Sequence, residues 1–146
     1  MKKLLKLLAL VIAILAILRI AEPKEQTLVI LSTNDMHGKI QRMPELATAV
    51  QACRDTTDCV LLVDAGDRWT GNAYVDRVAE PGRPIIDLMN RLGYDAAVLG
   101  NHEFDHGQAY LGRALDQMVE FEMLCANVKS DTSTFCQPKP YTVLER

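Results

Sequence analysis

Three short polar clusters in this sequence combine side chains that could bind a metal ion or transfer a proton. They are residues 34–38 (NDMHG), 64–67 (DAGD) and 100–105 (GNHEFD). Their carboxylates, imidazoles and amide oxygens are suitable ligands for divalent cations of the Mn, Zn, Fe or Mg type, and the adjacent glycines let the backbone turn tightly. Each cluster alone is weak evidence, because Asp-x-His and Gly-Asp pairs are common in turns and helix caps. Together, the three clusters indicate a metal site.

The clusters need a scaffold that brings them together, and the pattern of apolar residues predicts one. Strands are expected at residues 27–33, 60–64, 96–100 and 121–126, and helices at residues 44–53, 84–92 and 108–118. Strands that alternate with helices predict an α/β fold with a parallel sheet. Because ligands bind at the carboxyl edge of such a sheet, the three clusters should converge there.

Two segments resemble the signature segments of the 5'-nucleotidase family of calcineurin-like metallophosphoesterases. They are residues 28–40 (LVILSTNDMHGKI) and 94–105 (YDAAVLGNHEFD). Residues 64–71 (DAGDRWTG) resemble the block between them, and residues 125–128 (CANV) resemble a family strand that ends in Ala-Asn-Val. Ser32 stands where the family usually has a His that is not a metal ligand. The resemblance extends from about residue 27 to the last residue.

The resemblance implies the N-terminal half of a four-layer α/β/β/α metallophosphoesterase sandwich, with two divalent metal ions at the strand ends. By this resemblance, the first metal would be bound by Asp35 and His37, both metals by Asp67, and the second by Asn101. His102 would contact the phosphoryl oxygens or the leaving group. The resemblance also gives a role in orienting the His102 ring to Asp105.

The function implied is a phosphoester hydrolase that cleaves phosphate from nucleotides or related esters through a two-metal-activated water. UDP-sugar hydrolysis, cyclic-nucleotide cleavage and thiosulfohydrolase-type chemistry share this half of the site. The family's remaining ligands, two His and a Gly-His-x-His segment, come later in its sequences, and this sequence has no His after His106. Residues 27–146 are therefore expected to be a catalytic domain truncated at its C-terminus. The alternative is a catalytically inactive remnant or non-enzymatic module.

Four other residues near the clusters are expected to have structural roles. Glu103 is expected to hydrogen-bond and fix its loop, and Trp69 to pack under the second cluster. His106 is expected to be a solvated or capping imidazole, and Arg68 an exposed loop residue.

The first 21 residues have the pattern of a signal peptide or an uncleaved signal anchor. Lys2, Lys3 and Lys6 precede or flank an apolar run over residues 7–18, and Pro23 follows. Residues 22–26 would be a linker. The body is then expected to be exported, as a periplasmic, cell-surface or secreted protein, with membrane contact only through an uncleaved anchor.

Charge and cysteines limit the partners and the compartment. Without the four basic residues of segment 1–21, 12 of the 16 Lys and Arg remain against 19 Asp and Glu, a net charge of −7. Such an acidic body is a poor candidate for binding a nucleic-acid polymer. The resemblance implies a small phosphorylated substrate such as a nucleotide as the partner. Export would allow disulfides. The local pairing joins Cys53 to Cys59 and Cys125 to Cys136, and unpaired buried thiols are the alternative.

Overall fold

A parallel four-stranded sheet organises the chain. The structure is a computed structural model, and it describes residues 1–20, 27–129, 135 and 137–145. The strands are β1 (Val29–Thr33), β2 (Val60–Asp64), β3 (Ala96–Val98) and β4 (Glu122–Leu124), in the spatial order β1-β2-β3-β4. All three strand pairs are parallel. This confirms the predicted α/β class with a parallel sheet.

Helices connect consecutive strands. They are α2 (Met43–Arg54), the short α3 (Ala73–Asp76), α4 (Arg83–Leu92) and α5 (Gln108–Gln117), with single 3-10 turns η1 (Ile40–Arg42) and η2 (His102–Phe104). Proline lies in the first turn of α2 and of α4. Gly93 ends α4 in the left-handed conformation, with φ of 70°. The three longer helices agree with the predicted ranges to within one residue at each end.

The third and fourth strands are shorter than predicted. The third was expected to reach Gly100, but β3 ends at Val98 because the Gly100 N–H donates to the Glu103 carboxylate. The fourth was expected over residues 121–126. Past Leu124, however, the Cys125 N–H donates to the Lys139 carbonyl, outside the named strands. At Gly100 the backbone donor is bonded to a side chain and not to a strand, and at Leu124 the chain forms an isolated parallel bridge with Lys139.

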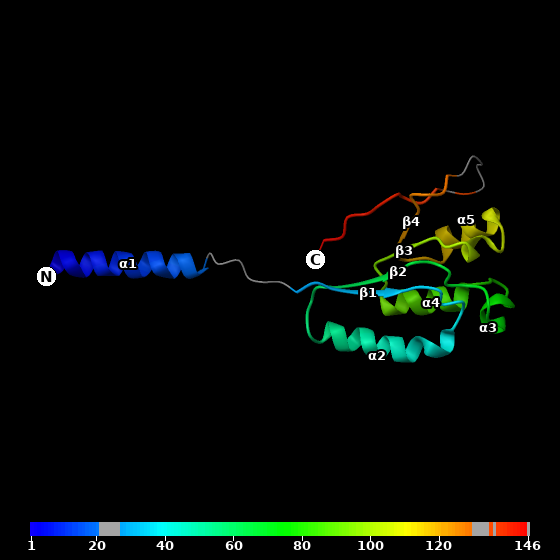
Figure 1. Ribbon diagram of the computed structural model, residues 1–146, viewed down its shortest axis with the longest axis horizontal. Coiled ribbons are helices and arrows are strands. Elements are labelled where there is room, and N and C mark those ends of the chain that lie inside the picture. The colour runs from blue at the N-terminus through cyan, green and yellow to red at the C-terminus, as the bar shows by residue number, and fades with distance from the viewer. Residues whose placement is uncertain (21–26, 130–134, 136, 146) are drawn as a thin grey trace.

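One face of the sheet carries the hydrophobic core. Along β2 the residues alternate between buried and partly exposed, as expected for a strand with one covered face. Leu62 of this strand packs in one cluster with residues of α2, α4 and α5. Figure 1 shows α2 and α4 running along the same side of β1 and β2. The buried members of the cluster are Met43, Val50, Leu62, Trp69, Val75, Ile85, Ile86, Met89, Tyr94, Leu111, Ala114, Met118 and Phe135.

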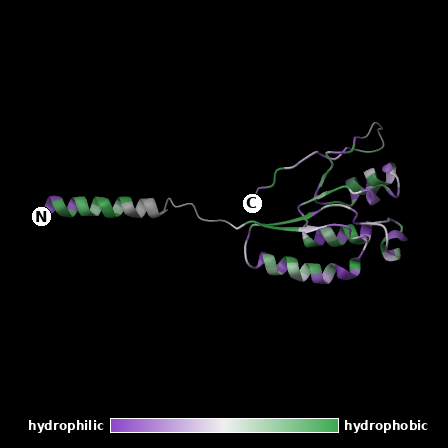
Figure 2. Ribbon diagram, viewed as in Figure 1, coloured by the Kyte–Doolittle hydropathy of each residue, from purple (hydrophilic) through white to green (hydrophobic). Residues whose placement is uncertain are grey.

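The opposite face of the sheet is open in the described part of the chain. Ile30 of β1 is 61% exposed and Val98 of β3 is 39% exposed. A shallow cavity of about 290 Å³ lies over the strands there, lined by residues such as Val63 and Leu124. Figure 2 shows that β1 and β2 are hydrophobic along much of their length. The open face is therefore apolar.

The first helix, α1 (Lys2–Ile20), adds no residue to the core over the part whose side chains the structure describes. Those side chains are exposed from Lys2 to Ile14. No helix in the described part of the chain has the length and apolarity needed to cross a membrane. Whether residues 1–21 are a signal sequence stays a prediction, and the predicted linker, residues 22–26, lies outside the described residues.

The predicted pairing of Cys53 with Cys59 is wrong, because both thiols are free. Cys53 lies in the last turn of α2, and the Cys59 carbonyl is bonded to the Val29 N–H at the start of the sheet. Cys125 is also free and is buried, while Cys136 lies outside the described residues.

Candidate metal centre

The first and second polar clusters are joined by their backbones. Beyond the ends of β1 and β2, the Asp35 N–H donates to the Gly66 carbonyl at 3.1 Å and the His37 N–H to the Asp67 carbonyl at 3.0 Å. The Gly38 N–H continues the series to the Arg68 carbonyl at 2.8 Å. The pairing of the two strands therefore extends into the loops and fixes one cluster against the other.

These loops contain four non-glycine residues with positive φ: Asp35 at 51°, His37 at 45°, Asp67 at 54° and Thr70 at 61°. This conformation is uncommon for residues with a side chain, and it persists where surrounding contacts enforce it. Three of the four are predicted metal ligands. Unusual backbone geometry thus coincides with the predicted site.

Three side chains from the three clusters meet at the carboxyl edge of the sheet. His37, Asp67 and His102, which we call the donor group, each offer one atom, and these atoms lie within 4.8 Å of one another. The His37 and His102 rings are 4.9 Å apart at their centroids, in an edge-on arrangement. Two imidazole nitrogens and a carboxylate oxygen match the ligand preferences of Zn, Mn and Fe type ions. The donor group therefore fits a divalent cation.

The His37 ring has a defined orientation. Its Nδ1 lies 3.2 Å from the Thr70 carbonyl oxygen, which fixes the ring and leaves Nε2 to face outward. A carbonyl partner on one ring nitrogen is the usual support of a metal-binding histidine.

The other two predicted ligands lie beside the donor group. Oδ1 of Asp35 is 3.8 Å from Nε2 of His37, and its second oxygen accepts a hydrogen bond from Asn34. Asn101 is exposed and immediately precedes η2, with no side-chain capping bond. Asp35 is thus within reach of the donor group, and Asn101 precedes one of its members.

His102 and Asp105 form a hydrogen-bonded pair, with Nδ1 2.8 Å from Oδ2. This bond is the main cause that raises the pKa of His102 above its ordinary value and lowers the pKa of Asp105. The His102 backbone N–H donates to Oδ1 of Asp67 at 2.9 Å. The contact expected between His102 and Asp105 is present, and Nε2 of His102 remains for the site.

The expectation that Arg68 is exposed is wrong. Its side chain is 1% exposed; Nε donates to Asp64 at 3.0 Å, and the guanidinium also donates to the Val98 carbonyl. The sequence carries one signal for this. Asp64 ends an otherwise apolar strand, and a buried carboxylate requires a partner such as the arginine four residues later.

The expectations for Glu103, Trp69 and His106 agree with the structure. Glu103 is fully buried and accepts hydrogen bonds from three backbone N–H groups. Trp69 is buried, and its indole N–H donates to the His102 carbonyl at 2.9 Å. His106 is exposed, with its ring edge-on to Tyr110.

A cavity of about 770 Å³ opens beside the donor group. His37 forms part of its wall, together with the cationic Lys39, the exposed ring of Tyr74 and the apolar Leu88. Its volume lies in the range of pockets that bind small molecules.

Comparison with known proteins identifies relatives of this chain. A family model described as calcineurin-like phosphoesterase matches residues 28–140. The 5'-nucleotidase of Bos taurus is 38% identical over 120 residues, which cover 70% of this chain and 21% of that protein. Snake venom 5'-nucleotidase of Gloydius brevicauda is 36% identical over 118 residues, covering 70% and 20%. The chain thus spans about a fifth of the length of these relatives.

Solved structures agree with the sequence relatives. The calcineurin-like phosphoesterase YfkN from Bacillus subtilis matches with a TM-score of 0.67 and 32% identity, over 82% of this chain and 42% of that chain. The NAD nucleotidase NadN of Haemophilus influenzae matches with a TM-score of 0.72 and 25% identity, over 82% and 24%. These findings confirm the resemblance read from the three polar clusters. The chain therefore belongs to the calcineurin-like phosphoesterase family, and its relatives include 5'-nucleotidases.

Proposed function

We propose that this chain provides metal-binding and phosphoryl-binding residues of a 5'-nucleotidase-type phosphoester hydrolase, which releases phosphate from nucleotides or related esters. The observation that carries the proposal is the convergence of His37, Asp67 and His102 at the carboxyl edge of the sheet. The relatives named 5'-nucleotidase support the choice of reaction.

Two divalent cations of the Mn, Zn, Fe or Mg type would be held by four residues. Asp35, His37 and Asp67 would bind the first, and Asp67 and Asn101 would contribute to the second. When bound, such cations lower the pKa of a water molecule to yield a nucleophile near neutral pH and neutralise charge on the phosphoryl group. The chain's own part is to hold the donors in place through the backbone bonds between the first two clusters.

His102 would act on the phosphoryl oxygens or the leaving group. The hydrogen bond to Asp105 fixes its ring and raises its pKa. An imidazole N–H can donate a hydrogen bond to a phosphoryl oxygen or a proton to a leaving group. Asp105 would be the orienting partner.

The substrate would be a small phosphorylated molecule such as a nucleotide. The cavity beside His37 is large enough for part of such a ligand, and Lys39 adds a positive charge to its wall. The relatives include venom proteins, and together with the signal-like segment 1–21 they support export of the body to the periplasm, the cell surface or the medium.

A second candidate is a non-enzymatic module or inactive remnant. The described residues supply few ligands for a second cation, Asp67 and Asn101, whereas such ions commonly take about four to six. The chain would then bind one cation weakly and catalyse nothing.

The test measures Mn²⁺ binding by electron paramagnetic resonance and hydrolysis of a chromogenic phosphate ester, with the 146-residue chain and its Asp67→Asn variant. Mn²⁺ binding that the substitution removes supports the metal site. Metal-dependent turnover in the same sample favours the hydrolase, and binding without turnover favours the inactive module. If the wild-type chain binds no Mn²⁺ or Zn²⁺ at millimolar concentration, the proposed function is wrong.

A further inference from the structure

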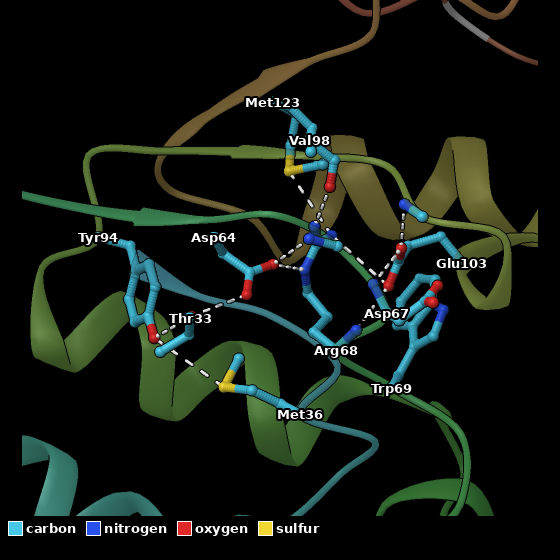
Figure 3. A network of polar contacts seen from close by, with 12 residues as sticks. Thr33, Met36, Asp64, Asp67, Arg68, Trp69, Tyr94, Val98, Glu103 and Met123 are labelled. Carbon is cyan, nitrogen blue, oxygen red and sulfur yellow. Dashed lines mark hydrogen bonds and ion pairs between the residues drawn. The ribbon is translucent and has the colours of Figure 1, made fainter. Parts of the chain in front are cut away.

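Beneath the donor group lies a buried charged triad of Asp64, Arg68 and Glu103. Their side chains are at most 1% exposed. Figure 3 shows Arg68 between the two carboxylates, with its guanidinium directed toward the Val98 carbonyl and Met123. Asp64 and Val98 end β2 and β3, Met123 lies within β4, and Glu103 belongs to η2. The triad therefore links the strand ends on which the polar clusters are mounted.

Glu103 connects two of the clusters through backbone groups. Its Oε2 accepts from the Asp67 N–H at 3.0 Å and from the Gly100 N–H at 2.6 Å, and its Oε1 accepts from the Arg68 N–H at 2.9 Å. The Arg68 guanidinium lies 3.9 Å from Oε1 and partly balances the carboxylate charge. The side chain of Glu103 thus satisfies three backbone donors, of which the Asp67 and Arg68 N–H groups lie on either side of the turn at Asp67.

The space around Asp67 leaves little freedom for another conformation. A Cβ atom added at Gly100 would lie 2.2 Å from Oδ1 of Asp67, and one added at Gly66 would lie 2.6 Å from the Gly100 nitrogen. The same Oδ1 accepts the His102 N–H. The second and third clusters are therefore in direct contact, and Asp67 keeps its positive φ between them.

We propose that Arg68 and Glu103 are positioning residues that set the conformation of Asp67 and His102 before any cation binds. This inference rests on the proposed function for its purpose. The conformation that it describes is that of the metal-free chain. Glu103 holds the backbone at Asp67 and Gly100, and Arg68 lies between Glu103 and Asp64 and contacts both carboxylates. Supporting groups of this kind typically change metal affinity by about 10- to 100-fold when they are removed.

The test compares Glu103→Gln with the matched control Glu80→Gln. Glutamine keeps the size of the side chain but replaces one accepting oxygen with an NH₂ group, which cannot accept from a backbone N–H. Glu80→Gln also weakens an arginine contact, to Arg83, at a partly exposed position outside the site. Amide hydrogen exchange by NMR is measured on the metal-free 146-residue chain, and Mn²⁺ affinity is measured in parallel.

We expect the wild-type amides of Asp67, Arg68 and Gly100 to be protected from exchange. Glu103→Gln should accelerate their exchange by at least about tenfold and weaken Mn²⁺ binding by about tenfold, with less than a twofold effect of Glu80→Gln. Unprotected wild-type amides at these three positions would overturn the proposal even if the variant fails to fold. Equal effects of the two variants would overturn it as well. A wild-type chain that binds no Mn²⁺ would instead defeat the proposed function, and the exchange rates would still decide the role of the triad.

Discussion

The candidate site has an exposed half, the donor group, and a buried half, the buried charged triad. The two halves differ in how their charges are balanced. The donor group lies at partly exposed positions and brings two imidazoles and a carboxylate together with no cationic side chain among them. The buried charged triad is excluded from solvent, and its carboxylates are matched by Arg68 and by backbone N–H groups. The charges of the buried half are therefore balanced within the protein, whereas the exposed half is arranged to receive a cation from outside.

The largest expected effect comes from breaking the buried half. Arg68→Met should destabilise the chain by about 3–5 kcal/mol, because it leaves Asp64 and Glu103 buried without their cationic partner. Urea unfolding followed by circular dichroism measures the change. Arg54→Met is the control, since Arg54 donates only to the Leu92 and Gly93 carbonyls at an exposed position. Similar losses of unfolding free energy for both variants would show that the buried triad stabilises the chain no more than an exposed arginine contact does.

A substitution in the exposed half should have the opposite effect, with a large loss of metal affinity and a small change in unfolding stability. Asp67→Asn should weaken Mn²⁺ binding by at least about 100-fold because it removes the charge shared by the two proposed cations, while unfolding stability changes by less than about 1 kcal/mol. Metal content after dialysis, determined by elemental analysis, checks the first part. Two metals retained per chain would remove Asp67 from its proposed bridging position.

A third substitution separates ligand from catalyst within the exposed half. His102→Ala should leave Mn²⁺ affinity within about threefold of wild type, and in any active, longer form of the protein it should lower turnover by about 100-fold. The reason is that the adjacent Asn101 is the ligand proposed on this loop, while Nε2 of His102 is proposed to face the phosphoryl group. Because His102 also belongs to the donor group, its removal must weaken metal binding if its ring is a ligand. Loss of the metal would reassign His102 as a ligand.

The smallest effect concerns pH and lies at the far end of the buried half. The Tyr94 hydroxyl bonds to Thr33, whose hydroxyl donates to Asp64, and burial raises the pKa of Tyr94 from 10.0 to about 12. The folded state therefore holds the phenol proton more tightly than the unfolded state. This contribution is complete below pH 10 and is lost as the pH rises toward 12.

Tyr94→Phe should remove that part of the pH dependence. Urea midpoints measured between pH 8 and 11 should fall less steeply for the variant than for wild type. Absorbance at 295 nm offers an independent check, because one of the four tyrosines of the wild-type chain should titrate last. Identical pH profiles for the two proteins would contradict the assignment.

The exposed half of the site was predictable from sequence, and the buried half was predictable only in part. Polar clusters after apolar strands identify the loops, since strand ends in a parallel sheet meet at one edge. The role of Glu103 followed from the same motif. Arg68 was missed because a loop arginine is exposed by default, and only the burial of Asp64 and Glu103 around it overrides that expectation.

Secondary structure shows the same division between local and tertiary information. Proline and glycine signals gave the bounds of α4 closely, because caps are encoded in neighbouring residues. The end of β4 depends on Lys139, which contacts the chain there from a more distant part of the sequence, whereas β3 ends before a local bond between Gly100 and Glu103. The free state of Cys53 and Cys59 is likewise a matter of how two elements are placed, which spacing along the chain does not determine.

The strand order β1-β2-β3-β4 has a consequence for how the chain folds. Every strand pairs with the strand before it in sequence, so each newly synthesised strand and helix can dock on an edge that already exists. We expect the region of β1, α2 and β2 to acquire structure before β3 and β4, because the β1–β2 ladder is the longest of the three while the three pairings close loops of similar length. Pulse-labelling hydrogen exchange during refolding should then protect Ala65, whose N–H donates to the Thr33 carbonyl, before Cys125. Simultaneous protection would indicate that the sheet forms only as a whole.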